Sequence, residues 1–234
     1  MKNALKFLSD LEKHNDRDWF HSNKTRYQEA KAVFERFIEE LICAISAFDD
    51  AIAPLTPKRS IFRLERDIRF ARDKTPYNPS FRACLSIGGK APIPTGYYIS
   101  IAPNNRSFLG GGLYASTFKE ASEAIRNKIA DRGEEFEKII NAKEFAKVFK
   151  IQGEKLKNAP IGFDKNAPQI EYIKHKSWYL QYSVSDEETK ADNFVEKAAR
   201  IYKVMKPFND YLNVALKEIK TPQKLNKERN CARL

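Results

Sequence analysis

Four segments in the first half of the chain alternate apolar and polar residues, and they constrain the fold more than any other feature. They cover residues 62–70, 81–87, 97–102 and 107–114. Alternation with a period of two is typical of strands that bury one face. Short connections separate the segments, and Pro103-Asn104-Asn105 has the composition of a hairpin turn. The pattern predicts an antiparallel meander, and residues 178–184 are expected to form one more short strand.

The rest of the chain is mainly helical by the spacing of its apolar residues. Amphipathic helices are expected over residues 3–14, 24–47, 116–129, 134–150 and 186–220. Pro207 is expected to kink or split the last of these, because proline removes a backbone hydrogen bond. We therefore expect an α+β fold in a single domain over residues 1–220, with an antiparallel sheet of four to five strands, several packed helices and a long C-terminal helix. Residues 221–234 are expected to form a frayed basic tail.

Composition narrows the environment and the partners. The 234-residue chain has a formal net charge of +11, which favours nucleic acid or other anionic partners. Cys43, Cys84 and Cys231 are widely spaced and odd in number, which suits a reducing compartment better than a disulfide framework. The chain shows no secretory signal and no apolar run long enough to cross a membrane. We expect a cytoplasmic protein without a membrane partner.

Residues 61–77, IFRLERDIRFARDKTPY, concentrate opposed charges among apolar side chains. As a strand followed by a loop, this segment would present on one side Arg63, Glu65, Asp67 and Arg69, and then Lys74 and Tyr77. Arginine donates two parallel hydrogen bonds, which suits phosphate and carboxylate oxygens. The aspartates would either orient the arginines or act as a general base. The alternative is a ladder of cross-strand ion pairs with a purely structural role.

The candidate ligand-binding residues follow from this segment and one helix start. They are Arg63, Arg66, Arg69, Lys74, Tyr77 and Lys24. Arg66 falls on the apolar side of the expected strand, where it needs a partner to offset its desolvation. Lys24 begins a helix one turn before Tyr27, and a helix start favours an anion. A role in covering that helix end is the alternative for Lys24.

No catalytic residue is identified, and the candidates are Asp67, Asp73 and His175. His175 is the best lone histidine for acid–base work, with a surface histidine as the alternative. The histidines and cysteines lack metal-ligand spacing, and adjacent arginines oppose a Mg²⁺ site at the aspartates, so no metal or cofactor is expected. The run Gly110-Gly111-Gly112 lacks a following Gly-Lys-Ser/Thr, which favours close backbone approach over a phosphate loop.

Several short motifs together resemble one family. The first group is Phe7-Leu8, Leu11, Asn15, Arg17, Trp19-Phe20, Asn23-Lys24 and Tyr27. The second is Arg63, Arg66-Asp67, Arg69-Phe70, Asp73-Lys74 and Pro76-Tyr77, followed by Gly110-Gly111-Gly112-Leu113-Tyr114 and Ala159-Pro160-Ile161-Gly162-Phe163. From about Ala4 to Tyr211 the chain resembles the largely bacterial domain-of-unknown-function family 2461. The resemblance implies no activity, substrate or cofactor, and Asn78 departs from the basic residue expected after Tyr77.

Three functional hypotheses remain open from the sequence. The first is a site for a phosphate-bearing or other anionic ligand on the arginine-rich segment. The second is nucleic-acid binding through the basic surface and the tail over residues 217–233. The third is an interaction or scaffold protein in which the charged segment is an ion-pair network.

Overall fold

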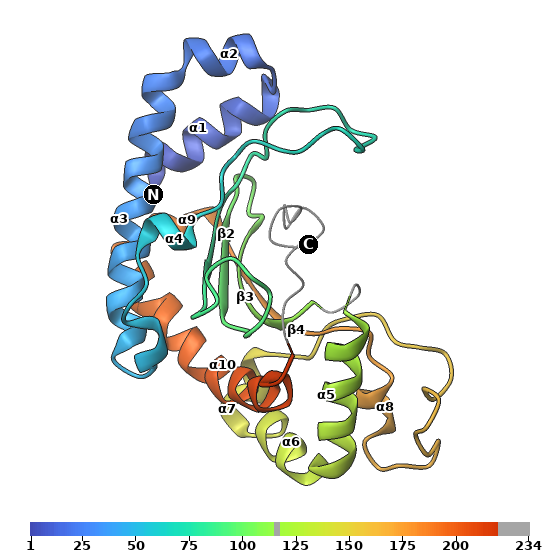
Figure 1. Cartoon of the computed structure of the whole chain (residues 1–234). Coiled ribbons are helices and arrows are strands. Elements are labelled where there is room, and N and C mark those ends of the chain that lie inside the picture. Colours follow the sequence, from blue (N-terminus) through green and yellow to red (C-terminus); the bar gives the residue numbers. More distant parts are fainter. Residues whose placement is uncertain (115–117, 220–234) are drawn as a thin grey trace.

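The computed structural model describes residues 1–114 and 118–219, which form an α+β fold around one antiparallel sheet (Figure 1). Its four strands are β1 (Phe81–Leu85), β2 (Tyr97–Ile101), β3 (Ser107–Leu113) and β4 (Trp178–Val184). They are paired in the order β1-β2-β3-β4. The predicted fold class is confirmed. The predicted tail over residues 221–234 lies outside the described residues.

The strands form where the alternating pattern predicted them. Every second residue of β1, from Phe81 to Leu85, is buried, and Ile99 of β2 lies opposite Leu109 of β3. Asn104 and Asn105 turn the chain between β2 and β3 with φ values of 65° and 57°. Asparagine adopts positive φ more readily than most residues, so these two positions suit a tight turn. This turn is as predicted.

Helices precede the sheet, interrupt it and follow it. Before β1 lie α1 (Lys2–Lys13), α2 (Arg17–Ser22), α3 (Lys24–Ser46), the 3₁₀ turn η1 (Asp50–Ile52) and α4 (Pro57–Ser60). Between β3 and β4 lie α5 (Lys119–Asp131), α6 (Gly133–Ile140), α7 (Lys143–Val148) and α8 (Ile170–Ile173). After β4 come α9 (Asp186–Lys190) and α10 (Phe194–Leu216). Buried apolar side chains from these elements form one hydrophobic cluster, whose members are spread along the chain between Ala4 and Leu216.

The C-terminal helix differs from its prediction in where it breaks. It continues through Pro207 as one helix, although proline withholds one backbone donor. The break comes earlier, between Lys190 and Phe194, so α9 is a separate short helix. Ser185 begins α9 with a reciprocal capping box to Glu188. This local capping, rather than the proline, divides the predicted helix.

One face of the sheet is covered by helices, and glycine allows the contact to be close. α3 and α10 lie along this face in Figure 1, and α10 packs on β3. A Cβ at Gly111 would meet Met205 and come within 3.2 Å of the Asn209 amide. The predicted close approach is therefore confirmed, with α10 as the partner of Gly111. At Gly112 the close neighbour is the backbone of Trp178.

The opposite side of the sheet, called the second face below, carries the alternate residues. Cross-strand pairing aligns Arg82, Ser100 and Phe108 in one row. The next row is Cys84, Tyr98, Gly110 and Gln181. In Figure 1 this face is flanked at the top by the long loop after α4 and at the bottom by α5.

Candidate functional site

The charged segment forms a projecting two-armed loop and no regular strand. Residues 61–80, called the arm below, run out from α4 and return to β1 above the second face (Figure 1). Phe62 N–H at the start of the arm donates to the Arg82 carbonyl of β1 (2.9 Å), and Arg66 N–H on the first limb donates to the Pro76 carbonyl on the second (2.9 Å). The predicted strand over residues 62–70 is wrong. Pro76 has no N–H to return the hydrogen bond of Arg66, and the limbs pair only at an isolated bridge between Glu65 and Tyr77.

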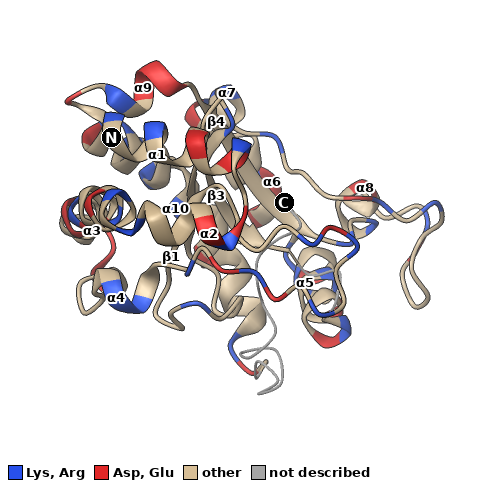
Figure 2. Cartoon of the chain, turned by 90° about the horizontal axis from the view of Figure 1, so that it is seen from above, with Lys and Arg blue, Asp and Glu red and all other residues tan. Residues whose placement is uncertain are grey.

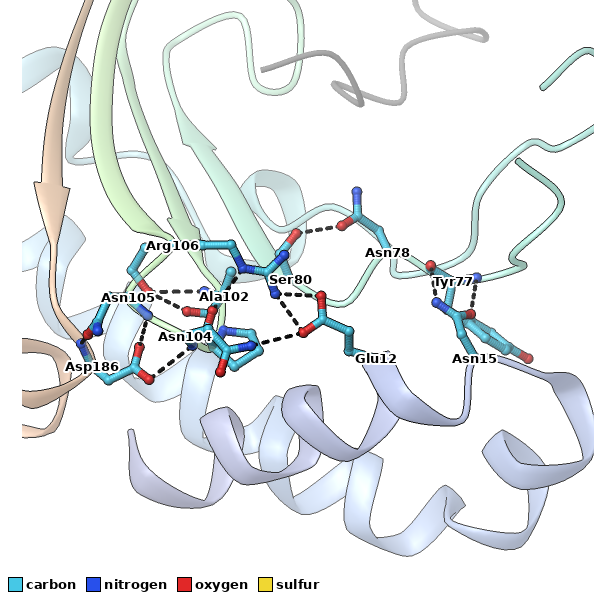
Figure 3. A network of polar contacts seen from close by, with 12 residues as sticks. Glu12, Asn15, Tyr77, Asn78, Ser80, Ala102, Asn104, Asn105, Arg106 and Asp186 are labelled. Atoms are coloured by element: carbon cyan, nitrogen blue, oxygen red, sulfur yellow. Dashed lines mark hydrogen bonds and ion pairs between the residues drawn. The ribbon is translucent and has the colours of Figure 1, made fainter. Parts of the chain in front are cut away.

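The base of the arm is fastened to α1 and α2 by an amide and a ring. The Asn15 amide donates to the Tyr77 carbonyl (2.9 Å), and its oxygen accepts the Tyr77 N–H (3.0 Å) (Figure 3). The Tyr77 ring stacks on Phe20 at 4.1 Å and is only 6% exposed. Burial raises the pKa of the Tyr77 hydroxyl. Tyr77 therefore belongs to the fastening of the arm.

Asn78 continues this fastening at the position where a basic residue was expected. Its side-chain oxygen accepts a hydrogen bond from the Ser80 hydroxyl (2.7 Å). Its N–H donates to the Leu64 carbonyl (2.8 Å). In this chain the position serves the local geometry of the arm (Figure 3).

A second polar network in Figure 3 ties the β2–β3 turn to α1 and to α9. Arg106 donates to both carboxylate oxygens of Glu12 on α1 (2.6 and 2.7 Å). Asp186 at the start of α9 accepts the N–H groups of Asn104 and Asn105 (3.1 and 2.9 Å). These contacts join residues far apart in sequence, so the turn is held from two sides.

Arg66 lies on the inner side of the arm and has the partner that its position requires. Its guanidinium donates to the Asp73 carboxylate (2.6 Å) and to the Thr75 hydroxyl (2.5 Å). The pKa of Asp73 is lowered to about 2, first by the Thr75 N–H and then by Arg66. A carboxylate with so low a pKa is a poor general base at neutral pH. The Arg66–Asp73 pair closes the loop at the tip of the arm.

Arg69 and Lys74 also bind within the tip. Arg69 reaches Asp67 through Nε (2.9 Å) and Nη2 (2.6 Å). This guanidinium is the main cause that lowers the pKa of Asp67 to about 2. Lys74 Nζ donates to the Ile68 carbonyl (3.0 Å). The two ion pairs of the tip are solvent-exposed, so each contributes little to stability.

The other sequence candidates are not gathered at the tip. Lys24 is exposed at the first residue of α3, and the described ranges offer it no ion pair. Arg63 is exposed near the base of the arm, where its carbonyl accepts from Arg82 Nη2 (3.4 Å). Basic residues are spread over most elements of the molecule (Figure 2).

His175 lies apart from the arm, just before β4, and it is not a surface histidine. Its residue is 3% exposed, and its carbonyl accepts from Arg126 (3.0 Å). Burial, followed by the charge of Lys155, lowers the pKa of His175 to about 4. The imidazole is therefore neutral at physiological pH and packs near Trp178.

The sequence analysis missed a cluster at the base of the arm, called the cation–aromatic cluster below. Its members are Phe62, Arg63, Arg82, Lys90, Tyr98 and Phe108. The Arg82 guanidinium lies 5.7 Å and the Lys90 ammonium 5.8 Å from the centre of the Phe62 ring. The Tyr98 ring is 6.2 Å from Phe62 and 5.7 Å from Phe108. These distances are in the range of cation–π and ring–ring contacts.

Burial distinguishes Arg82 from the other cations. It is 3% exposed, although arginine is rarely fully buried. Burial also lowers the pKa of Lys90. The one indication of this cluster in the sequence was Arg82 itself, a charged residue within an otherwise mostly apolar strand segment. Its neighbours Phe62, Lys90 and Tyr98 come from separate parts of the sequence, and only the fold brings them together.

The described residues were also compared with the requirements of a metal site and of a membrane-spanning helix. Within residues 1–114 and 118–219, no three His, Cys, Asp or Glu side chains are grouped so that they could hold a metal ion. None of the helices in those ranges combines the length and the apolar character that a membrane crossing requires.

The sequence matches one family along most of its length. A family model described as a conserved hypothetical protein, DUF2461, matches residues 3–211. The chain belongs to the DUF2461 family. The match runs from α1 into α10 and includes the arm, the sheet and the cation–aromatic cluster. No curated protein and no solved structure matches this DUF2461 chain.

Proposed function

We propose that this DUF2461 protein binds a phosphate-bearing ligand at the cation–aromatic cluster. The observation that supports the proposal most directly is that Arg82 and Lys90 both lie within cation–π distance of the Phe62 ring. Two cations that contact the same ring favour an anion beside them, because the anion is attracted by both charges. The neighbouring rings of Tyr98 and Phe108 suit a planar group attached to the phosphate.

The burial of Arg82 and the partial desolvation of Lys90 strengthen the case for an anionic ligand. A cation that has lost part of its hydration gains more from a phosphate oxygen than a fully hydrated one does. Lys90 has a lowered pKa for this reason and makes no ion pair within the described ranges. Arg82 is held by packing and by its bond to the Arg63 carbonyl, so its guanidinium is positioned in advance.

The sequence candidates take different roles in this proposal. Arg63 meets the cluster through its backbone carbonyl, and its exposed side chain would attract the ligand from the base of the arm. Lys24, Lys74 and Arg69 are exposed and would raise the local concentration of anions. Arg66 and Tyr77 hold the arm in position above the cluster. Asp67 and Asp73 orient arginines, so a ligand-binding role is favoured over acid–base catalysis at the tip.

Calorimetric titration with inorganic pyrophosphate and with adenosine monophosphate tests the proposal. Lys90→Gln is the main variant, because Lys90 is exposed and the loss of its charge should spare the fold. Lys138→Gln, at an exposed position on α6, is the matched control. We expect Lys90→Gln to weaken binding about tenfold, the effect of losing one charge-assisted contact, with an unchanged melting temperature. Absence of binding by the parent protein, or equal losses in both variants, would refute the proposal.

A scaffold role is the second candidate, and the two ion pairs of the tip favour it. Arg66–Asp73 and Arg69–Asp67 are satisfied inside the arm and need no ligand. If the arm is only structural, Arg69→Ala should leave all anion binding unchanged. A loss of binding in Arg69→Ala without a loss of stability would count against the scaffold role.

A further inference from the structure

We infer that the phosphate-bearing ligand is a single-stranded nucleic acid, which contacts the second face of the sheet and the tip of the arm, with Phe70 as a stacking residue. The inference rests on the proposed function, because the cation–aromatic cluster would bind the same strand. It adds the class of ligand and a second contact point.

Phe70 is the first observation. It stands at the tip of the arm with 94% of its surface exposed. The Arg69 guanidinium lies 5.8 Å from the ring centre, so the ring is presented next to a cation. An exposed ring with a positive neighbour can stack on a base while the cation meets the adjoining phosphate.

The tip holds Phe70 outward through its own polar contacts. Asp67 accepts both the N–H of Arg69 (3.2 Å) and its guanidinium. Lys74 Nζ donates to the carbonyls of Ile68 (3.0 Å) and Arg69 (3.4 Å). The residues just before Phe70 are therefore fixed from both sides. Pre-positioning reduces the ordering cost of binding.

The second face supplies further rings that suit unpaired bases. Tyr98 on β2 and Phe108 on β3 are stacked at 5.7 Å with an angle of 27° between their planes. Tyr179 on β4 lies 5.7 Å from Tyr114, which is 41% exposed. Aromatic rings across neighbouring strands of an antiparallel sheet form a platform for splayed bases. A duplex hides its base faces, so a single strand fits this platform better.

Charge on the arm points to a polyanion. Arg63, Arg69, Arg72 and Lys74 are exposed, and they alternate with acidic residues along the arm. The chain as a whole carries a formal net charge of +11. A strand that crosses from the cation–aromatic cluster to the tip would place phosphates beside these cations. An anionic membrane could meet the projecting tip, but a flat lipid surface would not reach the rings on the sheet face.

Fluorescence anisotropy with labelled oligothymidylate and oligouridylate, single-stranded and in duplex form, tests the inference. Phe70→Ala should weaken single-strand binding about tenfold, because one stacked base is lost. Phe70→Trp should retain the affinity. Ile161→Ala is the matched control, because Ile161 is fully exposed in the loop between α7 and α8, away from the arm (Figure 1). Binding should weaken steeply with added salt.

Three results would overturn the inference. They are equal binding by Phe70→Ala and the parent protein, tighter binding to duplex than to single strands, and Phe70-dependent binding to phosphatidylserine vesicles without oligonucleotide binding. Pyrophosphate titration separates this failure from failure of the proposed function. If Lys90 governs pyrophosphate binding while Phe70→Ala leaves oligonucleotide binding unchanged, the proposed function stands and the inference falls. If pyrophosphate and oligonucleotides both fail to bind, both are refuted.

Discussion

Replacing Asn15 by alanine should release the base of the arm from the connection between α1 and α2. The Asn15 side chain makes two hydrogen bonds, and both go to backbone groups of Tyr77. Tyr77 is buried, so its N–H and carbonyl have little access to replacement water. An unsatisfied buried group costs about 1–3 kcal/mol. Partial hydration of the half-buried Asn15 site lowers the sum, and we expect Asn15→Ala to reduce the free energy of unfolding by about 2–3 kcal/mol.

Urea denaturation followed by tryptophan fluorescence measures this loss, and amide exchange at Tyr77 locates it. Asn15→Asp keeps the acceptor for the Tyr77 N–H and loses the donor to the carbonyl, so it should cost less than alanine. Asn127→Ala, at an exposed position on α5, is the control and should change stability by less than about 0.5 kcal/mol. A similarly small change for Asn15→Ala, with unaltered exchange at Tyr77, would show that the arm is held by other contacts.

Three further predictions concern the sheet, the buried histidine and the tip. Gly112→Ala should lower the free energy of unfolding by about 3 kcal/mol or more, measured by thermal unfolding, because φ is +82° and its Cβ would meet the Trp178 carbonyl. Folding lowers the pKa of His175 from 6.5 to about 4, so between these pH values the imidazole takes up a proton only in the unfolded chain. The free energy of unfolding should therefore fall as the pH drops from 6.5 to 4, and His175→Gln should make its pH dependence flatter. Asp67 and Asp73 have pKa values lowered from 3.8 to about 2, so their contacts should persist at neutral pH and be lost toward pH 2 in a carboxyl ¹³C titration.

The sequence predicted the regular elements better than the site. The spacing of apolar residues along the chain shows which face of a strand or helix is buried. The strands β1 to β4 and helices such as α3 were predicted for this reason. The same alternation over residues 62–70 was misleading, because Pro76 on the returning limb cannot complete its hydrogen-bonded pair with Arg66 and the ladder does not continue. Arg66 was expected to need a partner, because an arginine that faces inward loses hydration of its charge in a strand or in a loop. The structure gives it Asp73.

The cation–aromatic cluster could not be predicted for a different reason. Arg82 belongs to β1, Phe62 to the arm, and Lys90 to the connection between β1 and β2. Their proximity depends on the return path of the arm and on strand register, which local composition does not encode. The family pattern nevertheless contained Asn15, Trp19-Phe20 and Tyr77, and the structure explains several of these as fastenings of the arm.

The exposed tip of the arm also divides the molecule in an unexpected place. Everything before it, α1 to α4, is helical or 3₁₀, and everything that builds the sheet comes after it. Yet the two parts share one hydrophobic cluster, with Phe34 of α3 packed against Phe81 of β1. Trypsin cleaves after basic residues, and Arg69 and Arg72 are among the most accessible ones at the tip. A single cut there would separate the helical piece from the sheet-forming piece without removing any packing between them. The two halves would remain an interlocked pair, so the arm is a natural point at which to split this protein for fragment complementation.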